Sequence, residues 1–161
     1  NDKLKDIWHA DALGGGKFIR YKVELASGST VAAPVCDVEC EFPQWDNRKT
    51  GSPHRLIYAA AVLQGDNSFF NGLVRVDVED GGMQVIKLPA GCFASEPMFV
   101  ARPGSSAEDD GVLLDVVYNA TSQNSELWVM DAAKISDVVA KVMLPHHIPH
   151  QFHGCFTNQL F

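Results

Sequence analysis

The sequence predicts an antiparallel all-β protein. Short strand-like runs recur about every ten residues, clusters of turn-forming residues separate them, and no apolar pattern indicates a helix longer than about two turns. Strands at such even spacing are typical of a sandwich, a barrel or the blades of a propeller. Composition does not choose among these three architectures.

Composition and charge indicate one soluble globular domain. The chain has 161 residues, of which 46% are apolar and 20% are charged, so it can bury a sizeable core. The net charge of −7 and the scattered Lys and Arg residues argue against a nucleic-acid partner. The longest apolar run, residues 56–63, is too short to span a bilayer. The four cysteines form no C-x-x-C pair, so we expect them to be reduced and mostly buried.

Three strands are predicted in the first part of the chain. Residues 17–25 alternate between apolar and charged side chains, which predicts a half-buried strand. Residues 35–42 form a second run, which we expect Pro43 to end. Residues 55–62 are apolar on both faces and fit a buried strand or a short helix. The neighbouring strands favour the first interpretation.

The clearest hairpin joins residues 73–78 and 83–88. The "EDGG" between them supplies glycines for a tight reversal. Loops rich in turn formers separate the remaining predicted strands, which are residues 96–101, 111–118, 126–131, 138–144 and 152–156. Residues 1–16, which include "GGG", are expected to be a loop or linker.

Four histidines lie close together in "LPHHIPHQFHG": His146, His147, His150 and His153. Prolines within this stretch oppose a helix, so we expect an extended segment that becomes a strand at residues 151–156. Side chains alternate along an extended chain, and the four imidazoles therefore cannot all converge. The first three fit a solvated loop.

His153 differs because it lies in an apolar strand beside Gly154. An imidazole is costly there unless both nitrogens are bonded, for example to a metal and a carboxylate. Glu41 and Glu96 are flanked by apolar residues and could supply that carboxylate. Each could equally be a strand-end side chain that bonds backbone amides or faces water.

The stretches "CEFPQWD", "SEPMFVARPGSSAEDDGVLLDVVYNA", "SELWVMDAAKISDVVAKVMLP" and "IPHQFHGCF" occur in that order. Together they resemble the C-terminal third of the carotenoid cleavage oxygenase family, from about residue 17 to residue 156. The resemblance implies a partial β-propeller, about two to three of seven blades. Residues 1–161 would then be the C-terminal part of one propeller domain.

In that family, iron on the propeller axis is bound by four histidines, three of which are held by glutamates. The resemblance implies that His153 is a metal ligand and that Glu41 and Glu96 orient such ligands. The implied cofactor is Fe(II), and the implied reaction is cleavage of a conjugated C=C bond by O2 into carbonyl products. His9, near the start of the chain, and His54, in a predicted loop, match no ligand motif of the family.

The implied partners are O2, a hydrophobic carotenoid, apocarotenoid or stilbenoid, and a preceding portion of the same protein that carries the other ligands. The isolated chain is therefore expected to be inactive. The resemblance also implies an intracellular location, cytoplasmic or plastid, with peripheral membrane contact allowed. Two alternatives stay open: a non-catalytic β-rich module that binds an apolar ligand or a protein, and a small metalloenzyme that uses the four clustered histidines.

Overall fold

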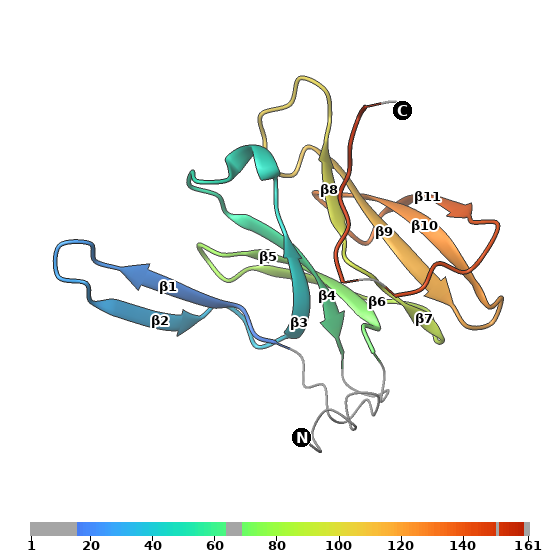
Figure 1. Cartoon of the computed structure of the whole chain (residues 1–161), viewed down its shortest axis with the longest axis horizontal. Helices are drawn as coiled ribbons and strands as arrows, with labels where there is room; N and C mark the ends of the chain where they lie inside the picture. Colours follow the sequence, from blue (N-terminus) through green and yellow to red (C-terminus); the bar gives the residue numbers. More distant parts are fainter. Residues whose placement is uncertain (1–15, 64–68, 151, 160–161) are drawn as a thin grey trace, which may run out of the picture.

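The described part of the chain is all-β, as the sequence predicts. A computed structural model describes residues 16–63, 69–150 and 152–159, in which eleven strands form three antiparallel sheets (Figure 1). The one helical element in these ranges is the single 3₁₀ turn η4 (Asn47–Lys49). The predicted linker up to residue 15 and His9 lie outside the described residues. The described residues contain no helix that is long and apolar enough to cross a membrane.

A four-stranded sheet occupies the first half of the structure. Its strands β3 (Glu39–Gln44), β4 (Leu56–Val62), β5 (Gly72–Asp77) and β6 (Met83–Lys87) follow one another in chain order. The predicted hairpin is therefore confirmed as β5–β6, and the apolar run as strand β4. Both faces of β4 are buried, since alternate residues enter two separate hydrophobic clusters. This explains the continuous apolar sequence of the strand.

A five-stranded sheet follows. Its strands are β7 (Cys92–Phe93), β8 (Met98–Ala101), β9 (Gly111–Asn119), β10 (Asn124–Asp131) and β11 (Val138–Met143). The order is β11-β10-β9, and β7 and β8 both pair with β9. The main core lies between the two larger sheets and includes the fully buried Tyr58, Leu73, Leu113 and Met130. Burial of each large apolar side chain contributes about 1.5–3 kcal/mol.

The ladder between β9 and its neighbours is interrupted. Strand β8 pairs with Gly111–Leu114, whereas β7 pairs with Tyr118 and Asn119. Residues 94–97 connect β7 to β8 and leave the ladder opposite the middle of β9. This break places Glu96 outside regular strand geometry.

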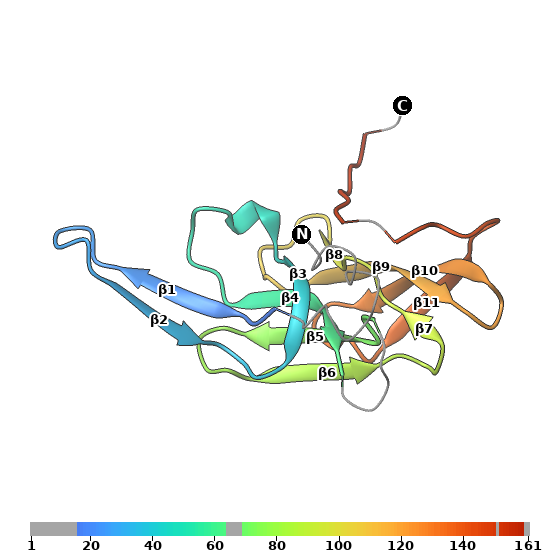
Figure 2. The same cartoon turned by 60° about the horizontal axis from the view of Figure 1, so that its bottom comes forward.

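Strands β1 (Ile19–Val23) and β2 (Thr30–Pro34) form a separate hairpin that projects from the sheets (Figures 1 and 2). The predicted half-buried strand over residues 17–25 is wrong in its burial, because every residue of β1 is exposed, including Tyr21 at 63%. No described element covers either face of this hairpin over its strand residues. The alternating pattern therefore marks a strand whose apolar side lacks a covering layer within the structure.

Pro43 does not end strand β3, contrary to the sequence prediction. The strand continues to Gln44 through a bulge, in which Glu41 pairs with Ala60 and Gln44 pairs with Tyr58. Proline is tolerated at such a bulge because the ladder hydrogen bond is already lost there. Ala60 and Tyr58 share a face of β4, so the bulge places Glu41 and Gln44 on one face of the sheet.

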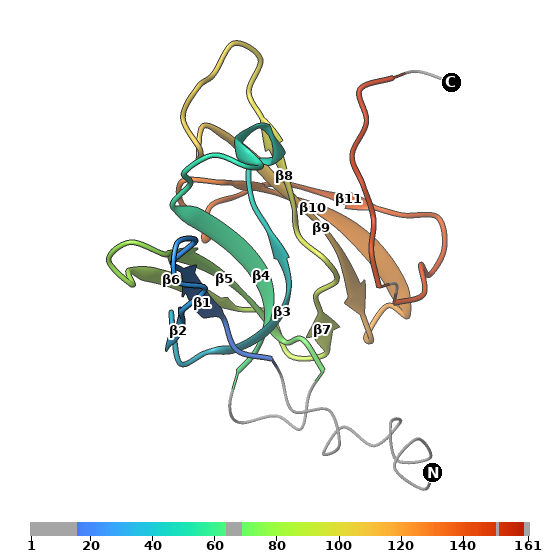
Figure 3. The same cartoon turned by 60° about the vertical axis from the view of Figure 1, so that its left-hand side comes forward.

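The strand predicted at residues 151–156 is also absent where the structure describes it, over residues 152–156. This segment is a coil without sheet pairing (Figure 3), and its residues 153–158 line one groove together with β8. The backbone N–H of Gly154 donates to the carboxylate of Glu96 instead of to a neighbouring strand. A side-chain acceptor thus replaces a ladder partner.

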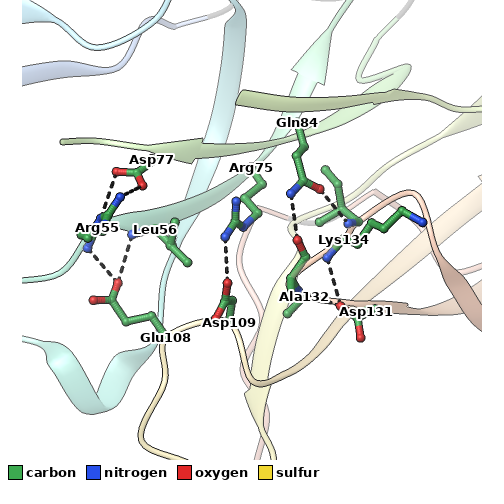
Figure 4. Close-up of polar contacts among 12 residues, drawn as sticks. Arg55, Leu56, Arg75, Asp77, Gln84, Glu108, Asp109, Asp131, Ala132 and Lys134 are labelled. Carbon is green, nitrogen blue, oxygen red and sulfur yellow. Dashed lines mark hydrogen bonds and ion pairs between the residues drawn. The ribbon is translucent and has the colours of Figure 1, made fainter. Parts of the chain in front are cut away.

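Polar contacts join the β8–β9 loop to the four-stranded sheet (Figure 4). Glu108 Oε2 accepts hydrogen bonds from the backbone N of Arg55 at 2.7 Å and of Leu56 at 3.0 Å. Arg75 Nη2 lies 2.9 Å from Asp109 Oδ2. These charged groups surround a hollow of about 350 Å³. Arg55 pairs with Asp77 and Arg75 pairs with Asp109, so these contacts neutralise charge around the hollow and connect the loop to the sheet.

Two further side chains bridge the sheets. Gln84 Nε2 donates to Ala133 O at 2.8 Å, and Gln84 Oε1 accepts from Ile135 N at 3.2 Å (Figure 4). The buried hydroxyl of Tyr58 donates to Ala132 O at 3.0 Å. The turn after β10 is therefore fixed to the four-stranded sheet.

Candidate metal centre

Glu96 and the ring of His153 are in direct contact. Glu96 Oε1 lies 3.1 Å from His153 Nδ1, and Glu96 Oε2 accepts from Gly154 N at 2.6 Å. Gln44 Nε2, from the bulged end of β3, donates to Glu96 Oε1 at 2.7 Å. The Glu96 side chain is 7% exposed, whereas that of His153 is 76% exposed. A buried carboxylate thus holds one edge of an accessible imidazole.

These contacts determine which nitrogen of His153 is free. Burial alone would raise the pKa of Glu96, but hydrogen bonds from Gly154, His153 and Gln44 outweigh it and lower this pKa. Glu96 is therefore ionised at neutral pH and can only accept hydrogen bonds. Nδ1 of a neutral His153 must then carry the hydrogen, which leaves the Nε2 lone pair available. Nε2 has no hydrogen-bond partner among the described residues.

Phe42 packs against the other side of the His153 ring. The two rings meet edge-on with centroids 5.8 Å apart, and Phe42 in turn contacts Phe70 of the core at 5.3 Å. Phe42 has a φ of 57°, which is unusual for a bulky residue and is a strained conformation often found at functional sites. The bulge in β3 and the break before β8 therefore both contribute to holding one imidazole.

A groove of about 800 Å³ opens beside this imidazole. Its walls are the segment 43–48, strand β8 with Glu96, and residues 153–158. Apolar side chains such as Met98 and Phe156 lie next to polar ones such as Gln44. The groove has room for a ligand group next to His153.

Glu41 does not reach His153 in this structure. Its side chain is exposed, and its Oε1 would lie 2.7 Å from a Cβ atom added at Gly16. Among the described residues, no hydrogen bond or ion pair joins Glu41 to a histidine. The structure therefore brings together Glu96 and His153, and it leaves Glu41 apart from them.

The other histidines that the structure describes lie in loops. His147 and His150 contact the ring of Tyr118 at centroid distances of 4.7 and 6.1 Å, and His150 also contacts Phe69 at 4.9 Å. Partial burial, with a smaller effect of His147, lowers the pKa of His150. No three or more His, Cys, Asp or Glu side chains in the described ranges could together hold a metal. The structure therefore does not bring the four clustered histidines together at one position.

His54 lies in a loop, as predicted, and stacks on Trp45 with centroids 5.8 Å apart. His54 does not line the groove beside His153.

All four cysteines are free, and Cys36, Cys40 and Cys92 are buried while Cys155 is exposed. This agrees with the prediction of reduced and mostly buried thiols. Burial, with a smaller contribution from Cys36, raises the pKa of Cys40 to about 12. Cys40 is therefore a protonated core residue at neutral pH and cannot act as a thiolate.

Sequence reasoning missed two residues, one that contacts Glu96 and one that contacts the residue before it. Gln44 reaches Glu96 only because the bulge turns it to the same face as Glu41. Asp115, in the middle of β9, is 1% exposed, and its Oδ1 accepts from Ser95 N at 3.1 Å. Its signal in the sequence was a single carboxylate inside the apolar run "GVLLDVVY".

Successive antiparallel sheets are typical of the blades of a β-propeller. An imidazole bonded to a carboxylate beside them is typical of a metal ligand. The chain belongs to the carotenoid cleavage oxygenase family: the family model described as RPE65, retinal pigment epithelial membrane protein, matches residues 3–158. The predicted resemblance is thereby confirmed. The partial-propeller prediction is confirmed as well, by the sheets together with the solved relatives described next.

Apocarotenoid-15,15'-oxygenase from Synechocystis sp. is 35% identical over 150 residues, which cover 92% of this chain and 31% of that protein. Resveratrol cleavage oxygenase 1 from Botryotinia fuckeliana is 29% identical over 150 residues, which cover 86% of this chain and 27% of that protein. Among solved structures, cobalt-substituted Synechocystis ACO superposes with a TM-score of 0.88 at 33% identity. That match covers 95% of this chain and 32% of the solved one. The chain thus spans about a third of the length of these relatives.

Proposed function

We propose that this chain supplies a histidine ligand, His153, and its orienting carboxylate, Glu96, to the iron(II) centre of a non-haem dioxygenase. The enzyme would cleave a conjugated C=C bond of a carotenoid, apocarotenoid or stilbenoid with O2 and give two carbonyl products. Relatives named for apocarotenoid and resveratrol cleavage support this substrate range. Residues 1–161 would form the C-terminal part of one propeller domain.

The observation that carries the proposal is the hydrogen bond between Glu96 Oε1 and His153 Nδ1. A metal-binding histidine commonly donates its second ring N–H to a carboxylate, which fixes the tautomer and raises the basicity of the ligand nitrogen. Neutral imidazole suits iron(II), so the free Nε2 of His153 fits the metal. The solved relative with cobalt in place of its natural metal supports a metal site in this fold.

Bound iron(II) would supply the redox chemistry with O2 that amino-acid side chains lack. The residues of this chain have a different part in the reaction. Glu96 keeps the hydrogen on Nδ1, Phe42 limits rotation of the His153 ring, and the groove beside the ring offers an apolar surface to an elongated substrate. Together they would orient one ligand beside a surface that can receive the substrate.

A single imidazole does not retain iron, because affinity at such sites comes from several converging ligands. We therefore propose that a preceding portion of the same protein supplies the other histidines, and that Glu41 orients one of them. The uncovered apolar residues of the β1–β2 hairpin, such as Tyr21, support a covering layer from that portion. The isolated chain would be inactive.

The test compares this chain with a longer protein that carries it at its C-terminal end. Both would be loaded with iron(II), analysed for bound metal, and incubated with an apocarotenoid or a stilbene under ¹⁸O2. We expect stoichiometric iron and labelled carbonyl products from the longer protein alone. His153→Ala should abolish both, whereas the loop variant His146→Ala should keep both. Iron and activity that survive His153→Ala would overturn the proposal.

Failure of every longer protein to cleave a polyene or stilbene, with intact folding, would favour the alternative of a non-catalytic β-rich binding module.

A relative from Arabidopsis thaliana is described as chloroplastic. We propose a cytoplasmic or plastid location with peripheral membrane contact, and fractionation of cells that express the protein tests it.

A further inference from the structure

Asp115 is a buried carboxyl group that contacts the backbone next to Glu96. Its Oδ1 accepts from Ser95 N at 3.1 Å, and its Oδ2 is buried without a hydrogen-bond partner among the described residues. A carboxyl group with an unsatisfied oxygen in a core costs free energy, and an apolar side chain would fill this position in a strand more favourably. Packing alone therefore does not explain Asp115.

The break in the ladder explains what Asp115 does. Strand β8 pairs with β9 up to Leu114, and β7 pairs with it again from Tyr118. Between these points residues 94–97 depart from β9, so the N–H of Ser95 has no strand partner. The part-buried N–H of Ser95 needs another acceptor, and the side chain of Asp115 provides one at this gap.

The residues on both sides of Glu96 are fixed. Ala94 N donates to Phe70 O at 2.8 Å, and this bond connects the segment to the residues just before strand β5 of the four-stranded sheet. Ser95 N is held by Asp115, and the fully buried Pro97 follows Glu96. Glu96 is the one residue of this segment that directs a charged group at the imidazole of His153.

We propose that Asp115 is a positioning residue for the metal centre: its carboxyl oxygen holds the Ser95–Glu96 backbone so that the Glu96 carboxylate meets Nδ1 of His153. The consequence for iron binding rests on the proposed function. The effect on the His153 ring does not, because it requires only the contacts between these residues.

The test uses the metal-free 161-residue chain with ¹⁵N-labelled histidine. Long-range ¹H–¹⁵N spectra report the ratio of the Nδ1–H to the Nε2–H tautomer of His153. Asp115→Val keeps a similar volume and suits a strand but removes the acceptor, Asp115→Asn keeps an acceptor oxygen without a charge, and Val117→Ala removes volume from the same face of β9. Thermal unfolding is measured on each sample.

We expect Asp115→Val to lower the tautomer ratio about tenfold, which corresponds to about 1.4 kcal/mol, without loss of thermal stability. Asp115→Asn should keep the tautomer ratio of the wild type. Val117→Ala should lower the unfolding temperature and keep the ratio. An unchanged ratio in Asp115→Val, or an equal fall in Val117→Ala, would overturn the assignment of Asp115. Neither outcome would affect the test of iron binding by His153.

Discussion

Glu96 and His153 are 57 positions apart in the sequence, yet Glu96 Oε1 lies 3.1 Å from His153 Nδ1. Glu96 lies in the break between two short strands, and His153 lies in a C-terminal segment that pairs with no strand among the described residues. Neither residue is placed by regular secondary structure. Their contact is fixed by side-chain hydrogen bonds from Gln44 and by the backbone N of Gly154.

We expect Glu96→Ala to remove the preference of His153 for the Nδ1–H tautomer. The carboxylate is the only acceptor that the described residues offer to this nitrogen, and hydrogen bonds to charged groups contribute about 1.5–3 kcal/mol. Long-range ¹H–¹⁵N spectra of the labelled chain measure the tautomer ratio. Glu41→Ala is the matched control and should leave the ratio unchanged. A shift in the control as large as in Glu96→Ala would contradict the distinction between these two glutamates.

Asp115→Asn should stabilise the protein above pH 7 and have little effect below pH 4. Burial raises the pKa of Asp115 from 3.8 to about 7, so between these values the folded state binds more protons than the unfolded state. The stability of the wild type therefore falls as the pH rises through this window, and asparagine removes that loss. At about 1.4 kcal/mol per pKa unit, the gain amounts to a few kcal/mol.

Urea unfolding of both proteins at pH 4 and pH 8 measures this difference. A variant that is equally stable relative to wild type at the two pH values would show that Asp115 is ionised with an ordinary pKa in the fold.

Glu108→Ala should destabilise the contact between the two larger sheets. Its carboxylate accepts from the backbone N of Arg55 and of Leu56, and the variant leaves both donors without this acceptor. We expect a loss of about 1–3 kcal/mol in the free energy of unfolding. Glu79→Ala is the control, because Glu79 forms an exposed ion pair with the side chain of Arg55, whose backbone N Glu108 binds, and this pair should contribute little. Equal effects of the two variants would refute a specific role of Glu108.

Alkylation should distinguish the cysteines. Cys155 is exposed, whereas burial protects Cys36, Cys40 and Cys92 and raises the pKa of Cys40 to about 12. With iodoacetamide at pH 8, mass spectrometry should detect rapid addition of one group, and Cys155→Ser should abolish that rapid phase. Fast modification of a second thiol in the folded protein would contradict the buried positions of the other three.

The strand content and a contact between His153 and one of the two glutamates could be expected from sequence, because they depend on local pattern and on family motifs. The apolar run at β4 and the "EDGG" turn each specify their own geometry. By contrast, the exposure of β1 depends on what lies against the strand, which periodicity does not encode. Pro43 was expected to end β3, because the local rule for proline does not include the bulge that accommodates it.

The contacts of Gln44 and Asp115 were likewise beyond sequence reasoning. Gln44 meets Glu96 across 52 positions, and Asp115 meets Ser95 across 20. Both contacts require a departure from regular pairing, in β3 for one and between β7 and β8 for the other. Side-chain alternation along a single strand carries no information about such departures.

The extra residue in β3 also constrains the length of this segment. Glu41 and Gln44 are an odd number of positions apart and would point to opposite faces in a flat strand. Loss of one residue between them would give a regular strand in which the glutamine still lies opposite Tyr58 on the same face, but it would remove the bulge that contains Phe42 with its φ of 57°. The number of residues between Glu41 and Gln44 therefore bears on the position of the Phe42 ring beside His153 more than on the face to which Gln44 points.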